Sequence, residues 1–188
     1  MNDMSHLKRL GDAYVRERTA ARQLQSLGSE LTRLSKTSIF SLQRGVASGP
    51  SITQAHRLVR KGSAIVKKFP SLRDAGPWRA GLEEYAEARL LASFVGGDAR
   101  LFADAIAGDP EIGLGALSDL VGELARLAVR EATAGHAAAV ERIGRDAERI
   151  VGFLTSLDLT GSLRSKGDQA RQHLRKIEDV RYDLSRRV

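Results

Sequence analysis

Cysteine is absent from all 188 residues of the sequence. This excludes disulfide bonds, thiolate metal sites and every zinc-finger arrangement. A chain of this length can still fold without such cross-links, because it buries roughly 70% of the surface that it exposes when unfolded. A protein without cysteine suits the reducing cytoplasm, and we expect a cytoplasmic location.

Long apolar runs are missing as well. No segment approaches the ~18 unbroken apolar residues that a membrane-spanning helix needs. The opening residues, Met1 to His6, carry Asp3 and lead into no apolar stretch, so we expect no secretory signal. The sequence therefore predicts a protein that stays in water.

Strand signals are nearly absent, since aromatic residues make up only 5% of the chain and β-branched and polar residues do not alternate convincingly. The four prolines, at positions 50, 70, 77 and 110, fall at breaks in helical patterning. We therefore predict an all-α fold of seven helices in a single domain, residues 1–188. The expected helices cover residues 5–46, 51–69, 78–95, 100–107, 110–134 and 136–157, with a last helix from beyond residue 161 to residue 187.

The apolar positions predict which face of each helix is buried. The second helix should bury Leu58, Ile65 and Phe69, and the fifth Leu117, Leu120, Leu124 and Leu127. In the first helix four leucines are spaced three, four and three residues apart, as in a coiled-coil seam: Leu24, Leu27, Leu31 and Leu34. This seam offers more apolar surface than one helix readily hides, so we expect the chain to self-associate.

The chain is basic, with 30 Lys and Arg against 23 Asp and Glu and a formal net charge of +7. Such an excess favours a polyanionic partner, although charge alone does not separate RNA, DNA and an anionic membrane surface. On the second helix Arg57, Lys61 and Lys68 share one stripe, with Arg60 beside them. This stripe is either a contact surface for phosphates or a solubilising face.

Two pairs of acids stand out on two helices. Glu84 and Glu87 are three residues apart, and Asp119 and Glu123 are four apart, so each pair lies on one helical face. The small residues Gly115, Ala116 and Gly122 flank the second pair and let another helix come close. Four carboxylates from two helices could thus converge on a hard cation such as Mg²⁺ or Mn²⁺.

The acidic faces also fit solvated helix surfaces that bind no metal. Arg126 and Arg130 extend the second acidic face as possible ion-pair partners, and most such faces are simply solvated. The histidines at positions 6, 56, 136 and 173 form no helical pair, which favours single solvated or capping roles. A ribonuclease that uses two histidines as acid and base is therefore not favoured.

Two segments carry a resemblance to a known family. Residues 119–126, DLVGELAR, resemble the signature helix of the translin family, and residues 176–187, KIEDVRYDLSRR, resemble its closing helix. The order of breaks from Gln43 to Val46 and at Phe69-Pro70 is similar too, so the likeness extends over nearly the whole chain. Within the family, Gly81 to Ala88 and Asp119 to Glu123 resemble the nucleolytic branch, translin-associated factor X.

The resemblance implies a translin-like helical bundle that assembles into a hollow, octamer-like shell. It also implies an endoribonuclease that binds and cleaves single-stranded RNA with Mg²⁺ or Mn²⁺. The metal-binding catalytic set would be Glu84, Glu87, Asp119 and Glu123. Glu83 stands where the eukaryotic relatives have an uncharged residue, and it is either a further ligand or a bystander.

The assembly, the substrate and the activity each leave an alternative open. The connection between the acidic helices is shorter than in the eukaryotic relatives, which favours a prokaryote-like member that assembles from itself. Metal-assisted hydrolysis does not require the 2′-hydroxyl, so single-stranded DNA is a second possible substrate. The rivals to an enzyme are a shell that binds single-stranded nucleic acid without cutting it and a helical protein with no nucleic-acid partner.

Overall fold

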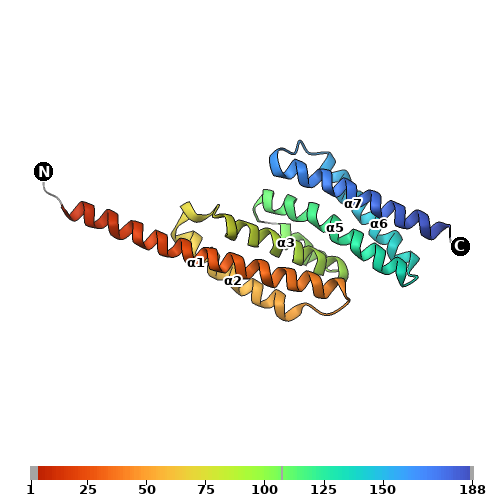
Figure 1. Cartoon of the computed structure of the whole chain (residues 1–188), viewed down its shortest axis with the longest axis horizontal. Coiled ribbons are helices and arrows are strands. Elements are labelled where there is room, and N and C mark those ends of the chain that lie inside the picture. Colours follow the sequence, from red (N-terminus) through yellow and green to blue (C-terminus); the bar gives the residue numbers. More distant parts are fainter. Residues whose placement is uncertain (1–3, 107, 187–188) are drawn as a thin grey trace.

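A computed structural model describes residues 4–106 and 108–186 of the chain (Figure 1). The described residues form seven α-helices and one short 3-10 helix, and they contain no strand. The predicted all-α fold of seven helices is confirmed. The elements are α1 (Met4–Gln43), α2 (Gly49–Lys68), η1 (Pro70–Leu72), α3 (Gly76–Gly96), α4 (Ala99–Ile106), α5 (Pro110–Thr133), α6 (Ala137–Thr155) and α7 (Gly161–Ser185).

The helix ends lie close to the predicted ones because glycine marks several of them. Gly45 follows α1 with a φ of 73°, and Gly97 follows α3 with a φ of 70°. This left-handed conformation favours glycine and ends a helix. The sequence analysis missed the η1 turn, which begins at Pro70 directly after α2.

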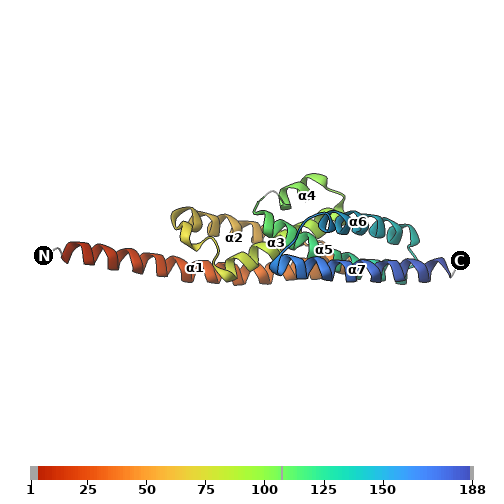
Figure 2. The same ribbon diagram turned by 90° about the horizontal axis from the view of Figure 1, so that it is seen from above.

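The helices form two groups of three. In one, α1, α2 and α3 enclose a core that includes Leu24, Leu31 and Trp78. In the other, α5, α6 and α7 enclose a larger core with Leu124 and Ile143, and α3 packs on α5 to join the groups. Seen from above, α1 and α7 run along one side of the molecule, with α2, α4 and α6 on the other (Figure 2).

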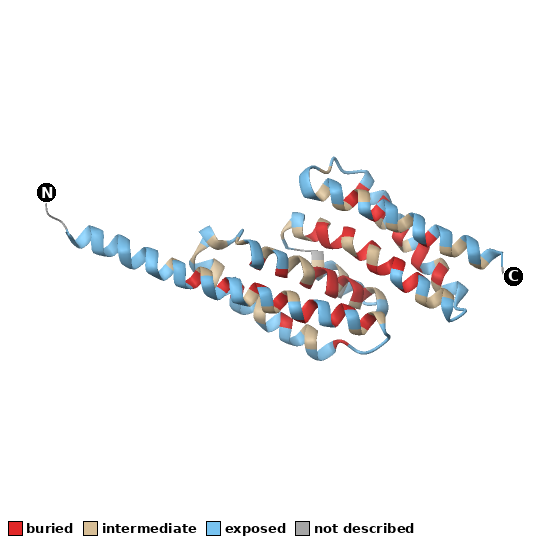
Figure 3. Ribbon diagram, viewed as in Figure 1, coloured by how far each residue is buried: buried red, intermediate tan, exposed pale blue. Residues whose placement is uncertain are grey.

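The leucine seam of α1 packs inside the chain rather than against another copy. Leu24, Leu31 and Leu34 are buried against Trp78 and Tyr85. The seam is therefore the wrong reason to expect self-association. Apart from Phe40 near its end, the exposed large apolar residues of α1 lie on its first part, which projects beyond the other helices (Figures 1 and 3): Met4, Leu7, Leu10, Tyr14 and Val15.

Helix α2 turns its predicted face to the core, because Leu58 and Ile65 pack against the cluster of α1 and α3, although they and Phe69 are only partly buried. Its buried residues are the small Ala55 and Gly62. A Cβ at Gly62 would lie 2.1 Å from the Trp78 ring, so glycine on this face lets the large side chain lie directly against α2. In α5 the predicted face is confirmed, because Leu117, Leu120, Leu124 and Leu127 are all buried.

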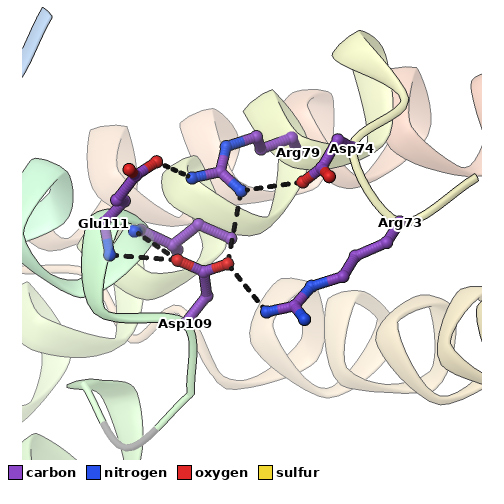
Figure 4. A network of polar contacts seen from close by, with 6 residues as sticks. Arg73, Asp74, Arg79, Asp109 and Glu111 are labelled. Atoms are coloured by element: carbon purple, nitrogen blue, oxygen red, sulfur yellow. Dashed lines mark hydrogen bonds and ion pairs between the residues drawn. The ribbon is translucent and has the colours of Figure 1, made fainter. Parts of the chain in front are cut away.

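A network of ion pairs holds the start of α5 against α3 (Figure 4). Arg79 of α3 contacts Asp74 at 3.2 Å, Asp109 at 3.3 Å and Glu111 at 2.5 Å, while Arg73 reaches Asp109 at 3.2 Å. Asp109 also caps α5, because its carboxylate accepts the backbone N–H of Glu111 at 3.0 Å. The network thus joins the two helices that carry the predicted acids.

No helix in the described part of the chain combines the length and the apolar character that crossing a membrane requires.

The closest backbone approach joins α1 to α3. A Cβ at Gly28 would lie 2.3 Å from the carbonyl oxygen of Pro77, and a Cβ at Gly81 would lie 2.6 Å from that of Gly28. Backbone atoms cannot move aside as the end of a side chain can. The two helices therefore need glycine where they cross.

We predict that Gly28→Ala lowers the free energy of unfolding by about 2 kcal/mol or more, because the added methyl group forces α1 away from α3. The measurement is urea unfolding followed by circular dichroism. Gly152→Ala in α6 is the matched control, since a Cβ there meets nothing within 4 Å. It should be neutral or stabilise by up to about 1 kcal/mol. Equal stability of the two variants would contradict the close packing.

Candidate functional site

A cavity of about 600 Å³ opens between α1, α3 and α5. Three of the four predicted acids line it, namely Glu84 and Glu87 from α3 and Glu123 from α5. The other lining residues come from the end of α1, apart from one arginine of α5: Lys36, Ile39, Phe40, Gln43, Arg44 and Arg126. Asp119, the fourth acid, does not line the cavity.

Small residues on α5 let the neighbouring helices come close, as the sequence predicted. A Cβ at Gly115 would lie 2.6 Å from the Glu83 carboxylate of α3. A Cβ at Gly122 would lie 3.2 Å from the His173 ring of α7. Acids from α3 and α5 therefore share one region, and α7 closes its far side.

Glu87 is the most unusual of these acids. Its side chain is 8% exposed, and no hydrogen bond or ion pair joins it to another described residue. Burial and, after it, the negative charges of Asp119, Glu123 and Glu84 together raise the pKa of Glu87 to about 8, against the opposing effect of Lys166. A carboxyl group is thus buried among three others with nothing to neutralise it.

Glu123 is equally buried but fully paired. The Gln43 side chain donates to Glu123 Oε2 and to the Glu123 backbone carbonyl, both at 2.8 Å. Arg126 donates to Oε1 at 2.8 Å. These contacts fix the Glu123 carboxylate at the edge of the cavity and tie the end of α1 to α5.

Lysines pair with the remaining acids. Lys36 of α1 lies 3.2 Å from Glu84 Oε1. Lys166 of α7 bridges Glu83 of α3 and Asp119 of α5. Burial acts to lower the pKa of Lys166, but its hydrogen bonds to Asp119 and Glu83 raise that pKa overall. Glu83 is therefore an ion-pair partner of Lys166 in this structure, beside Asp119.

Within the described residues, no group of three or more His, Asp or Glu side chains is arranged to hold a metal ion. The donor set nevertheless fits a divalent cation, because both oxygens of Glu87 and one oxygen of Glu84 have no hydrogen-bond partner among the residues described. Mg²⁺ and Mn²⁺ prefer carboxylate oxygens. Glu84, Glu87 and Glu123 would hold such an ion if Glu84 and Glu123 turned from Lys36 and Arg126.

The basic stripe of α2 lies apart from these acids. Arg57, Arg60, Lys61 and Lys68 are all exposed, and none of them pairs with an acid in the described part of the chain. None of them lines the cavity either. The cations that the structure does bring to the cavity come from α1 and α5: Lys36, Arg44 and Arg126.

Sequence analysis missed several residues of this region. Lys36, Arg44 and Lys166 carry no local motif, and the contacts of the two lysines with acids depend on how distant helices pack. His173, expected to be solvated or capping, is instead half-buried against Gly122. Burial and the nearby charges of Lys176 and Arg126 lower the pKa of His173.

The fold defines a class of protein, because solved structures of similar shape are C3PO chains. A crystal structure of apo-NeC3PO matches with a TM-score of 0.84 over 98% of this chain and 98% of that chain, at 20% identity. A structure described as an AfC3PO–duplex RNA complex matches with a TM-score of 0.82 over 96% of each chain, at 20% identity. A crystal structure of AfC3PO has a TM-score of 0.80 at 21% identity, covering 96% of this chain and 97% of that chain.

The sequence of the C-terminal helices matches a known family. Residues 109–188 match the model of the Translin family. The matched segment begins at Asp109, the N-cap of α5, and includes α6 and α7. This part of the chain is similar to the Translin family in sequence, and the whole chain has the fold of the C3PO chains. The predicted resemblance is confirmed. No curated protein sequence gives a significant match.

We predict that the free energy of unfolding in EDTA falls as the pH rises from about 4.5 to about 8. Between these values the Glu87 carboxyl stays protonated in the folded chain but ionises in the unfolded one, so the unfolded state gains in stability as protons become scarce. Glu87→Gln should remove this contribution and be more stable at pH 8, by on the order of a few kcal/mol. The measurement is urea unfolding at a series of pH values.

The control for this experiment is Glu178→Gln on α7, which removes an exposed carboxylate and should leave the pH dependence unchanged. If Glu87→Gln kept the wild-type slope, the Glu87 carboxyl would not be a buried, protonated acid.

Proposed function

We propose that the chain is a metal-dependent endoribonuclease, which binds and cleaves single-stranded RNA with Mg²⁺ or Mn²⁺. The observation that carries this proposal is the unpaired, buried Glu87 among Glu84, Asp119 and Glu123, beside a cavity with cations at its edge. An uncompensated buried charge is expensive and usually marks a partner or a function. A divalent cation would supply the compensation and would connect these acids to a phosphate.

Two comparisons support this choice of substrate and reaction. One protein of the same fold is described in a complex with duplex RNA. Within the translin family, the acids of residues 81–88 and 119–123 resemble those of translin-associated factor X, the nucleolytic branch. The net charge of +7 favours a polyanion as well.

The residues of the cavity have separate roles in this proposal. When bound, Mg²⁺ or Mn²⁺ supplies the positive charge that activates water and stabilises a phosphate under attack. Gln43 holds the Glu123 carboxylate in place, while Arg44 offers its guanidinium group to the phosphates of the substrate. Glu84, Glu87, Asp119 and Glu123 are the proposed catalytic and metal-binding set, with Asp119 joining when Lys166 releases it.

A second candidate function is binding without cleavage, because three of the four acids already have cationic partners. Glu84 pairs with Lys36, Glu123 with Arg126 and Asp119 with Lys166. If these pairs persist, the chain is a shell protein that holds single-stranded RNA or DNA without cutting it.

We propose further that the chain acts in the cytoplasm as a homo-oligomeric, octamer-like shell. The match to C3PO chains over nearly their whole length supports this assembly. So do the exposed apolar residues on the projecting part of α1, such as Leu7, Leu10 and Tyr14, since apolar surface of this kind favours association.

We predict that EDTA abolishes RNA cleavage and that Glu123→Gln and Asp119→Asn lower its rate at least tenfold, because a divalent cation needs the charge that these changes remove. Binding of an uncleavable RNA should persist or tighten, since a negative charge near the phosphates is lost. The assay compares cleavage with and without EDTA and binding by fluorescence anisotropy.

The matched control for this assay is Glu178→Gln, which removes an exposed carboxylate from α7. Cleavage that persists in EDTA, or acid variants as active as the wild type, would contradict the metal mechanism. Binding with no cleavage under any condition would identify the non-cutting shell instead.

The exposed α2 stripe is the proposed backbone contact, formed by Arg57, Arg60, Lys61 and Lys68. We predict that Lys61→Glu with Lys68→Glu weakens binding to all sequences alike and flattens the salt dependence by about 1.4 in log–log slope, the loss of two phosphate contacts. The measurement is fluorescence anisotropy of labelled RNA at salt concentrations from about 50 to 200 mM. Arg145→Glu with Arg164→Glu, which reverses two exposed charges elsewhere, should keep the wild-type slope. An unchanged slope in the α2 variant would mean that the stripe only faces solvent.

A further inference from the structure

Phe40 is an exposed aromatic residue at the acid cavity. It is 58% exposed and lines the cavity together with Glu84, Glu87 and Glu123. Its neighbour Ile39, by contrast, is buried in the core. An aromatic ring that is exposed to water does not gain the free energy of hydrophobic burial. A ligand with a flat apolar face would cover the ring and supply that gain.

Arg44 lies over this ring. The guanidinium carbon of Arg44 is 4.2 Å from the centre of the Phe40 ring, in the geometry of a cation–π contact. Arg44 also lines the cavity, is exposed, and forms no ion pair with any residue in the described ranges. Lys36 and Arg126 at the same cavity are already paired with Glu84 and Glu123. Arg44 is thus the cavity cation whose charge remains available for a phosphate.

The end of α1 holds this pair in a fixed position. Arg130 of α5 donates to the last carbonyls of the helix, those of Leu42 at 3.3 Å and Gln43 at 2.7 Å. The Gln43 side chain reaches Glu123 at 2.8 Å. Since α1 ends here at Gln43 and is anchored on α5, little conformational freedom remains for a ligand to remove.

We propose that Phe40 and Arg44 form a stacking platform for one unpaired nucleobase of the substrate. The base lies on the surface of the ring that Arg44 leaves open, and the guanidinium group binds the adjoining phosphate. This places the backbone of the same nucleotide beside Glu84, Glu87 and Glu123. The inference rests on the proposed function and adds to it the residues that position the strand.

The chemistry of stacking fits a single strand. Every base has a π face, so an aromatic platform accepts all four bases, and each stacked base contributes substantially to binding. In a duplex both faces of a base are covered by its neighbours, and exposing one requires unstacking. The platform would therefore favour single-stranded RNA over duplex RNA at this cavity.

Fluorescence of the Phe40→Trp variant tests the platform directly. The natural Trp78 is 2% exposed in the core, so its emission should be insensitive to a ligand at the cavity. Addition of single-stranded oligouridine in EDTA should quench the emission of Phe40→Trp, with the same midpoint as binding measured by anisotropy. Phe153→Trp on α6 is the matched control, since Phe153 is 50% exposed and does not line the cavity. Its emission should not change.

Removal of the ring gives a second measurement. Phe40→Ala should weaken binding of oligouridine roughly tenfold, as expected for the loss of one stacked base. Binding of an abasic strand of the same length should be unaffected by this change, because that strand has no base to stack. Phe40→Tyr should restore wild-type binding of oligouridine. Equal weakening for both strands would indicate a structural role for Phe40 and overturn the proposal.

The remaining outcomes are also decisive. RNA binding by anisotropy without any change in Phe40→Trp emission would overturn the platform and leave the proposed function standing. If the emission changed when the protein was diluted but not when RNA was added, Phe40 would be a contact between subunits. This outcome would overturn the platform too. If wild-type protein binds no RNA, the proposed function and the platform fail together.

Discussion

The burial of Glu87 is the constraint on which the rest of the site depends. A carboxyl group that is 8% exposed and surrounded by Glu84, Asp119 and Glu123 can be accommodated in only two ways: it stays protonated, or a cation neutralises it. The first state is the one in this structure, where the pKa of Glu87 is raised to about 8. The second is the state in which the cavity would act on a phosphate.

The cations of the chain hold the other acids ready for this second state. Three cations from three different helices take part: Lys36, Arg126 and Lys166. Each pairs with an acid whose negative charge raises the pKa of Glu87. Lys36 is exposed, and ion pairs of exposed side chains contribute little to stability, so exchanging its pair with Glu84 for a metal ligand costs little. The cations on α1, α5 and α7 thus hold the acids in position. They also determine how much of the negative charge of the site is left without a partner.

Much of the fold could be predicted from the sequence because helix periodicity and helix ends are local properties. Proline and glycine marked the ends of the helices, and the four leucines of α5 identified its core face. The seam of α1 identified its buried side but not its partner, since only the tertiary packing shows that Trp78 covers it. Spacing likewise found the four acids. It could not find Lys166 or Gln43, whose contacts join helices far apart in the sequence, or the Phe40–Arg44 pair, which is local but reaches the cavity only because α1 packs beside α3 and α5.

The position of Mn²⁺ in soaked crystals tests the central claim most directly, because anomalous scattering locates the ion without reference to activity. The account predicts a peak within about 2.3 Å of a Glu87 oxygen, with the Glu84 carboxylate turned from Lys36 to face it. A crystal that shows no peak at millimolar Mn²⁺, with Glu84 still on Lys36 and Glu123 still on Arg126, would contradict it.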